Sequence, residues 1–300
     1  MKSTKAFLVS SGDTSGLIHL SQAQQEKLRS VYAAIMRDIF DFCGENGICC
    51  MLCGGSCLGA VRHGGFIPWD DDVDLCMPRK DYDRFIALFS TQRSDRYELL
   101  VPDGRHRVIG TMLKVALRGT RMEDMYVAGS GVSPGIYVDV FPVEDVPDDP
   151  FVRRVKGVCA DLLNFLAVSG YYYQCQNPHM KKCFSGSARS RALFFLRRAL
   201  GFLISFKDYG WWYRKLDRFV QGKEGSRYCT IPTGRKHYFG EMHPREVFFP
   251  PKECRFETMS LYGPADADAY LRALYGDYMK LPPETERETH PLVALDFADA

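Results

Sequence analysis

The sequence predicts a mixed α/β (α+β) fold, in which helices flank a sheet and a mainly helical segment occupies the middle of the chain. Three observations predict this class: apolar residues at helical spacing over 22–45, short strand-like runs such as 48–52, and helical patterning across 151–225. With 300 residues, the chain can bury a full core as one large or two smaller domains. Its 46% hydrophobic and 25% charged residues are ordinary for a globular protein.

The charge balance argues against bulk nucleic-acid binding, so we expect no nucleic-acid partner. The 39 Lys and Arg residues exceed the 37 Asp and Glu residues by only two. The apolar run at 7–9 is too short for a signal peptide, and no uncharged stretch approaches the roughly 18 residues of a membrane-spanning helix. Eleven cysteines, mostly in apolar surroundings, are typical of reduced thiols. Together these features predict a cytoplasmic protein.

The first elements follow from helical spacing and capping signals. A capping box at 21–24 predicts a helix that stops at 45–47. The apolar run 48–52, bounded by glycine, predicts a buried strand. Residues 54–56, Gly-Gly-Ser, then turn the chain into a short helix that reaches residue 62.

An acidic run comes next, between a loop and a second helix. Polar and apolar side chains alternate over 70–77 except at Asp71, which predicts a strand. A helix is expected over 79–89, directly after a proline. Two further strand-like segments follow at 111–117 and 135–141.

The acidic, proline-rich stretch 143–150 is expected to be a loop and the main boundary of the chain. Later, strands and turns are expected over 228–262, followed by a closing helix at 266–279 and a polar tail. The predicted division has four parts: an N-terminal extension at 1–20, a core at 21–150, a helical segment at 151–225, and a C-terminal segment at 226–300 that packs back on the core.

The most informative feature is the alternating spacing of Asp70, Asp72 and Asp74. On an extended chain alternate residues project to one face, so Asp72 and Asp74 present two carboxylates there. Like charges held together are costly unless a cation neutralises them, and Mg²⁺ or Mn²⁺ suits carboxylate oxygens. Asp139, on a later strand, is the candidate third ligand. Two adjacent strands would then form the metal clamp used in phosphoryl displacement.

Other interpretations of these carboxylates compete with the metal site. The run could be a solvated acidic loop, and Asp139 could be an edge-strand carboxylate without a ligand role. An EF-hand loop starting at Asp70 fails, because its sixth position is Leu75 instead of glycine and its twelfth is Asp81 instead of glutamate.

Gly54, Gly55 and Ser56 are candidate phosphate-binding residues. Glycines between a strand and a helix let backbone N–H groups approach a phosphate, which the helix N-terminus also attracts. Ser56 offers a further hydroxyl donor.

Basic residues near these motifs are candidates to neutralise a pyrophosphate group. Arg62 and Lys114 are the main ones, and His63 and Arg79 are weaker. The alternative for each is a surface or helix-capping charge.

Residues 189–207 have the composition of a basic amphipathic helix. They mix large apolar residues with Arg197 and Arg198, which suits peripheral contact with an anionic membrane. A helix packed on the core with its arginines outward is the favoured alternative. The aromatic clusters at 171–173 and 211–213 are expected to pack in a core or groove instead of forming a cage for a quaternary ammonium group.

The order of these features is that of the nucleotidyltransferase fold: strand, Gly-Gly-Ser turn, helix, strand with two aspartates, later strand with a third. The stretch CGGSCLGAVRHGGFIPWDDDVDLCMPRKDYDRF at 53–85 strongly resembles the LicD family. That family comprises bacterial phosphocholine transferases and related enzymes, with fukutin and fukutin-related protein as distant relatives. Segments 135–145 and 270–290 fit the same pattern, whereas about 150–235 does not.

The resemblance implies a metal-dependent reaction on a nucleotide-activated donor. Family members transfer a phospho-alcohol such as phosphocholine from a CDP-linked donor to a glycan hydroxyl, so a CDP-choline donor and a glycan or lipid-linked glycan acceptor are expected. The implied roles are metal ligation by Asp72, Asp74 and Asp139 with Asp70 in support, a general-base alternative for Asp139, and contact with donor phosphate by Gly55 and Ser56.

Two other functions compete with this one. The first is a nucleotidyltransferase proper, in which attack at the phosphorus next to the nucleoside releases pyrophosphate. The second is a catalytically silent relative that binds a glycan or nucleotide. The intact set of carboxylates argues against a silent protein, which has no need to hold repelling charges together.

Overall fold

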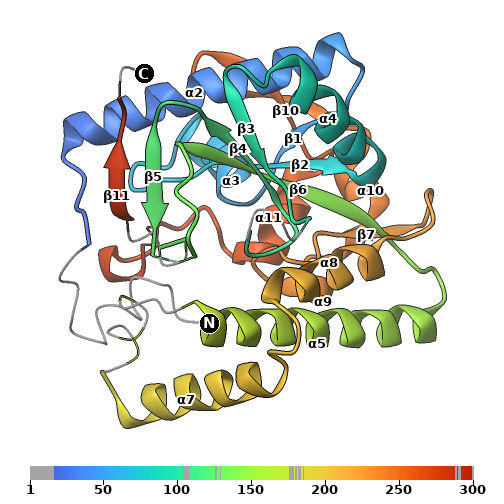
Figure 1. Cartoon of the computed structure of the whole chain (residues 1–300). Coiled ribbons are helices and arrows are strands. Elements are labelled where there is room, and N and C mark those ends of the chain that lie inside the picture. Colours follow the sequence, from blue (N-terminus) through green and yellow to red (C-terminus); the bar gives the residue numbers. More distant parts are fainter. Residues whose placement is uncertain are drawn as a thin grey trace.

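The computed structural model describes residues 17–103, 108–125, 127–128, 130–175, 179, 181, 184, 186–287, 289 and 292–298. Helices flank a curled sheet in this part of the chain, which confirms the predicted mixed α+β class (Figure 1). Most of the predicted N-terminal extension lies outside the described residues. Every cysteine among the described residues is a free thiol, as expected.

The central sheet has seven strands within the described residues. Its main path runs β1 (Met51–Leu52), β2 (Asp74–Pro78), β6 (Tyr137–Val146), β4 (Leu113–Leu117) and β3 (Tyr97–Leu100), while β7 (Tyr228–Thr230) and β8 (His243–Pro244) extend from the far end of β6. Only β2 and β6 are parallel, and the other paired strands of this sheet are antiparallel. The parallel pair joins the two strands that carry the predicted acidic residues.

Helix α2 (Gln22–Glu45) begins at the predicted capping box and packs one face against the sheet. The Ser21 hydroxyl accepts a hydrogen bond from the Gln24 backbone, and the Gln24 side chain accepts one from Ser21 in return. These bonds satisfy backbone donors that a helix start leaves without partners. Its buried face is apolar and consists of Leu28, Val31, Tyr32, Ile35, Met36, Ile39, Phe42 and Cys43.

The next helices occur where expected, but the strands before them are shorter. Helices α3 (Gly54–His63) and α4 (Arg79–Gln92) follow β1 and β2. The strand expected over 70–77 is wrong in its first half, because Asp70 closes a turn onto Ile67 and β2 starts only at Asp74.

The boundary expected at 143–150 is displaced. Strand β6 continues to Val146, and the next element is α5 (Pro150–Gln174), capped by Asp149. The prediction of a loop at 143–146 failed because the strand tolerates Pro142, which has no backbone N–H to donate. On the edge of β6 that pairs with β4 and β7, Pro142 falls between the residues that pair with β4 and those that pair with β7.

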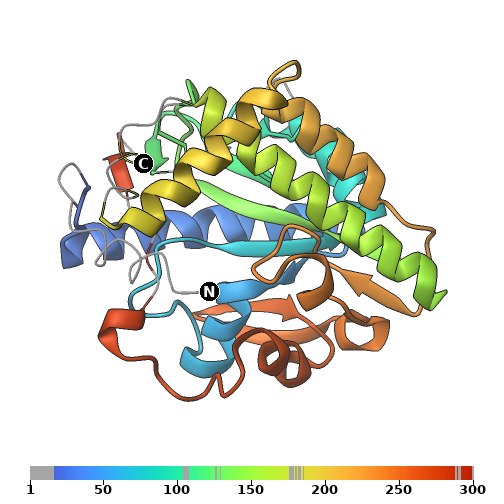
Figure 2. The same ribbon diagram turned by 90° about the horizontal axis from the view of Figure 1, so that it is seen from below.

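A second hydrophobic cluster lies between β6 and a layer of helices. This layer consists of α5, α7 (Ala188–Leu203) and α8 (Tyr209–Val220), and α5 contacts both of the others. Figure 2 shows α5 and α7 on the side of the molecule that is seen from below. Tyr171 and Tyr213 are buried in this cluster, as expected for aromatics that pack. Among the described residues, no helix is long and apolar enough to cross a membrane.

The C-terminal residues return to the core and the sheet. Their elements are α9 (His237–Gly240), α10 (Arg245–Phe248), β9 (Lys252–Phe256), β10 (Met259–Gly263), α11 (Ala267–Tyr275), the 3-10 turn η1 (Glu284–Glu286) and β11 (Leu292–Asp296). Helix α11 ends earlier than expected because Gly276 adopts a positive φ of 70°. The expected polar tail instead contains β11, which pairs with β5 (Arg121–Asp124); strands β3, β5 and β11 were not predicted.

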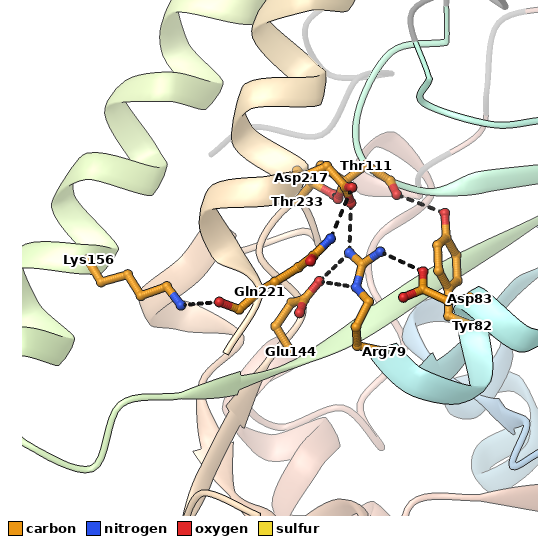
Figure 3. A network of polar contacts seen from close by, with 9 residues as sticks. All are labelled: Arg79, Tyr82, Asp83, Thr111, Glu144, Lys156, Asp217, Gln221 and Thr233. Atoms are coloured by element: carbon orange, nitrogen blue, oxygen red, sulfur yellow. Dashed lines mark hydrogen bonds and ion pairs between the residues drawn. The ribbon is translucent and has the colours of Figure 1, made fainter. Parts of the chain in front are cut away.

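Arg79 ties the helical layer to the sheet (Figure 3). Its guanidinium donates to Glu144 on β6, at 2.8 Å from Nε, and to Asp217 on α8, at 2.7 Å from Nη2. The Glu144 side chain is fully buried. Burial raises the pKa of Glu144 to about 6, and Arg79 opposes that rise. The weaker expectation that Arg79 contacts pyrophosphate is therefore wrong, because this arginine is committed to two carboxylates within the fold.

Replacing Arg79 by Met removes the cation from a buried carboxylate, so we expect the free energy of unfolding to fall by about 3 kcal/mol at pH 8. A carboxyl whose pKa is higher in the folded than in the unfolded protein stabilises the folded state at pH values below its unfolded pKa. This stabilisation is lost as the pH rises through the folded pKa. Glu144 without Arg79 should protonate more readily, so the loss should be smaller at pH 5 than at pH 8. Urea unfolding at the two pH values measures both quantities.

Lys80→Met is the matched control for this variant. Lys80 is adjacent in sequence but exposed, and its nearest acidic partner is Glu224 at 3.8 Å. It should change the free energy of unfolding by less than about 0.5 kcal/mol. An Arg79→Met loss that is equally large at both pH values would contradict this account of Glu144.

Candidate active site

Three predicted site residues lie side by side across neighbouring strands. Lys114 on β4 is paired with Asp139 on β6, and Asp139 is paired with Asp74 on β2. Residues directly opposite each other in neighbouring strands project from the same face of a sheet. The sheet therefore brings Asp74 and Asp139 together although they are distant in the sequence.

The Asp139 carboxylate forms an ion pair with Lys114. The Lys114 ammonium lies 2.7 Å from Oδ1 and 3.1 Å from Oδ2 of Asp139, and both side chains are largely buried. Burial raises the pKa of Asp139, Lys114 opposes that rise, and the nearby Asp72 adds to it. Lys114 thus stabilises a carboxylate that burial and a like charge would otherwise neutralise.

Carboxylate oxygens of Asp70, Asp71 and Asp72 lie close enough together to hold a metal ion. One oxygen from each lies within 4.8 Å of the others. Mg²⁺ and Mn²⁺ prefer such oxygen ligands, so the donor set fits a hard divalent cation. Asp70 and Asp72 were predicted for a metal site, whereas Asp71 was not, because the alternation expected of a strand placed it on the opposite face.

The Asp74 side chain contacts the start of α3. Its Oδ2 accepts a hydrogen bond of 3.4 Å from the Gly55 N–H, and its own N–H donates to Ser56 Oγ at 2.9 Å. The Gly54 N–H donates to the Tyr270 hydroxyl at 3.0 Å. These predicted phosphate-binding amides therefore have partners within the protein, and their contact with a phosphate stays a prediction.

Gly54 is required by its surroundings. Its φ is +50°, and a Cβ at this position would lie 2.5 Å from Oδ2 of Asp74. Any larger residue would both strain the backbone and displace the Asp74 carboxylate.

A cavity of about 230 Å³ opens beside the ion pair. Its polar side includes Asp72, Lys114 and Asp139, and its other walls are mainly apolar. Tyr137 also lines it, with the Lys114 ammonium 3.8 Å from its ring centre and its hydroxyl donating to Asp124 at 2.6 Å. Asp124 and Tyr137 were not predicted as site residues. Tyr137 lies within a predicted strand, two residues before Asp139 and on the same face, which is the one local signal that could have found it.

Arg62 lies near Asp70. Its Nη1 donates to the Tyr278 carbonyl at 2.7 Å, and its Nε donates to His63 at 2.9 Å. Partial burial lowers the pKa of Arg62, while Asp70 acts to raise it. Arg62 thus interacts with the acidic run through Asp70.

Comparison with known proteins identifies relatives of this chain. Residues 47–155, which contain every predicted site residue, match the family described as LicD/FKTN/FKRP, nucleotidyltransferase domain. The chain is 26% identical over 273 residues to a lipopolysaccharide cholinephosphotransferase LicD of Haemophilus influenzae, a match that covers 83% of this chain and 88% of that protein. Uncharacterized proteins of Rickettsia typhi and Rickettsia prowazekii are each 37% identical over 71 residues, 21% of this chain and 23% and 26% of theirs.

Gly54→Ala should destabilise the protein and turn the Asp74 carboxylate away from α3. Gly47→Ala is a matched control, because Gly47 has a similar φ of +58° but no atom within 4 Å of the place that a Cβ would take. Both variants should lose about 1 kcal/mol to backbone strain, and Gly54→Ala should lose clearly more. Urea unfolding measures the difference, and equal losses would show that the contact with Asp74 has no energetic weight.

Proposed function

Residues 47–155 match the nucleotidyltransferase domain of the LicD/FKTN/FKRP family, and on this premise we propose a metal-dependent phosphotransferase. The proposed reaction moves phosphocholine, or a similar phospho-alcohol, from a CDP-linked donor to a hydroxyl of a lipopolysaccharide or a related glycan precursor. The relative that matches most of the chain is named for phosphocholine transfer and lipopolysaccharide, which supports this choice of group and acceptor.

One observation carries the proposal: Asp72, Lys114 and Asp139 line a single cavity. Phosphoryl transfer can use a base, a cation and a further carboxylate, and all three occur in the lining of this mainly apolar cavity. The cavity is large enough for a small phospho-alcohol group, and its carboxylates offer an attractive field to a cationic alcohol such as choline.

The proposed metal is Mg²⁺ or Mn²⁺, and Asp72 is the central ligand. Asp72 belongs both to the close group Asp70–Asp72 and to the set with Asp74 and Asp139 that the family resemblance implies. When bound, such an ion neutralises phosphate charge and makes CMP a better leaving group.

Asp139 is the proposed general base. The acceptor hydroxyl forms a new bond to the phosphorus distal to cytidine, the bond from that phosphorus to the CMP oxygen breaks, and the hydroxyl proton passes to Asp139. Burial raises the pKa of this carboxyl, which makes it a stronger base, while Lys114 keeps it charged and in place.

The competing reaction is nucleotidyl transfer, in which CTP is consumed and pyrophosphate is released. The two are separated by incubating the protein with CDP-choline and a glycan acceptor, or with CTP and phosphocholine, and by measuring CMP and pyrophosphate. The proposal expects CMP alone. Release of pyrophosphate without CMP would show that the protein catalyses the competing reaction and would refute the proposal.

Asp72→Asn and Asp139→Asn should each lower the rate of CMP release at least about 100-fold, because each removes a charge used in the transition state. Asp95→Asn, at an exposed position, is the control and should retain full activity. Circular dichroism verifies that the variants are folded. Wild-type rates in folded Asp72→Asn would refute the proposed site.

Asp71→Asn distinguishes the two possible sets of metal ligands. If the ion is held by the close group, this variant should raise the Mg²⁺ concentration for half-maximal activity about 10-fold or more. If Asp72, Asp74 and Asp139 hold it, the Mg²⁺ requirement should stay near that of the wild type. Titration of activity with Mg²⁺ after treatment with EDTA decides between them.

A further inference from the structure

The outer face of α5 is apolar along most of its length. Five large residues recur at spacings of three and four, which places them on one side of the helix. Each of these residues is at least 42% exposed: Phe151, Val155, Val158, Leu162 and Phe165. A monomeric globular protein rarely exposes an apolar stripe of this extent unless the stripe contacts a partner.

Helix α7 also has exposed apolar residues, on the same side of the molecule (Figure 2). Its exposed apolar residues, with those of the following turn, are Leu193, Phe195, Leu196, Phe202, Leu203 and Phe206, and all are at least 51% exposed. Both helices lie on the side of the molecule that Figure 2 shows from below. We call these exposed residues of α5 and α7 the apolar face.

The orientation of α7 is the reverse of the one favoured from the sequence. Arg197 lies with its guanidinium 5.3 Å from the ring centre of Phe165 on α5, and Arg198 lies 6.0 Å from that of Tyr173. The one buried residue of α7 is Gly201, where a Cβ would lie 2.2 Å from the Ser169 carbonyl oxygen. Arg197 and Arg198 therefore point toward α5, and Phe194 packs in the second hydrophobic cluster. The apolar side chains of α7 that point outward are Leu193, Phe195, Leu196, Phe202 and Leu203. The prediction of outward arginines is wrong.

The charge of these two helices restricts the kind of partner. Together α5 and α7 carry seven basic residues, two of which are the inward Arg197 and Arg198, and one acidic residue. The rest of the chain carries 32 basic and 36 acidic residues. Arg154, Arg189 and Lys207 are exposed around the apolar face. A second copy of the chain would oppose one cationic surface to another, which is unfavourable. An anionic lipid surface offers acyl chains to the apolar residues and negative headgroups to the basic ones.

We propose that the apolar face of α5 and α7 binds the surface of an anionic membrane. The helices lie in the plane of the interface, with phenylalanine and leucine side chains at the depth of the acyl boundary and basic residues among the headgroups. This contact would hold the whole protein, and with it the proposed active site, at the membrane surface. It does not depend on which donor or acceptor the protein uses.

Sedimentation with vesicles tests the proposal on the full chain without any substrate. The wild type should bind vesicles of phosphatidylglycerol and phosphatidylcholine, and binding should weaken with added salt and be weak on phosphatidylcholine alone. Phe195→Ser/Leu196→Ser should weaken binding at least about 10-fold, because each residue contributes buried apolar area only on the membrane. Tyr262→Ser, a 49% exposed residue on β10, is the control and should bind like the wild type.

Two outcomes overturn the proposal. One is equal vesicle binding by the wild type and Phe195→Ser/Leu196→Ser. The other is a wild type that does not bind vesicles but is a dimer by light scattering and becomes a monomer in that variant, which would make the face an interface between copies. Rates of CMP release with a water-soluble acceptor should be the same in both proteins, so a failure of the proposed reaction is detected separately.

Discussion

The parallel pairing of β2 with β6 is the constraint on which the rest of the site depends. Its register sets Asp74 opposite Asp139, and β4 on the other side of β6 sets Lys114 opposite Asp139. Without the lysine, burial would drive Asp139 toward its neutral form and a like charge at Asp72 would add to that tendency. The sheet thus holds Asp139 in the lining of the cavity together with Asp72, at a cost that a bound cation and Lys114 can offset.

The same strand connects the site to the helical layer. Strand β6 carries Asp139 near its start and Glu144 near its end, and Arg79 links Glu144 to Asp217 on α8. Buried charges are costly without their partners, so the Arg79 network favours one placement of α8 relative to β6. The helical layer is therefore positioned relative to the site by one polar network (Figure 3) in addition to apolar packing.

The helical layer has apolar residues on both of its surfaces, one buried against the sheet and one exposed. Toward the sheet it buries Tyr171 and Tyr213, and away from the sheet it exposes the apolar face of α5 and α7. The inward arginines of α7 pack on aromatic rings, where cation–π contacts compensate in part for their lost hydration. A transferase with an acceptor in or near a membrane would gain from such a layer, since its active site would meet the acceptor in two dimensions instead of three.

The sequence by itself determined those features whose signals are local. The capping box that starts α2 and the acidic run depend on near neighbours in the sequence, and so does the family resemblance that locates the site residues. Tertiary structure alone decided that Asp139 pairs with Lys114, that Arg79 binds Glu144, and which face of α7 points outward. The partners in these contacts come from segments far apart in the chain, and a helical period fits either orientation until the neighbouring helix is in place.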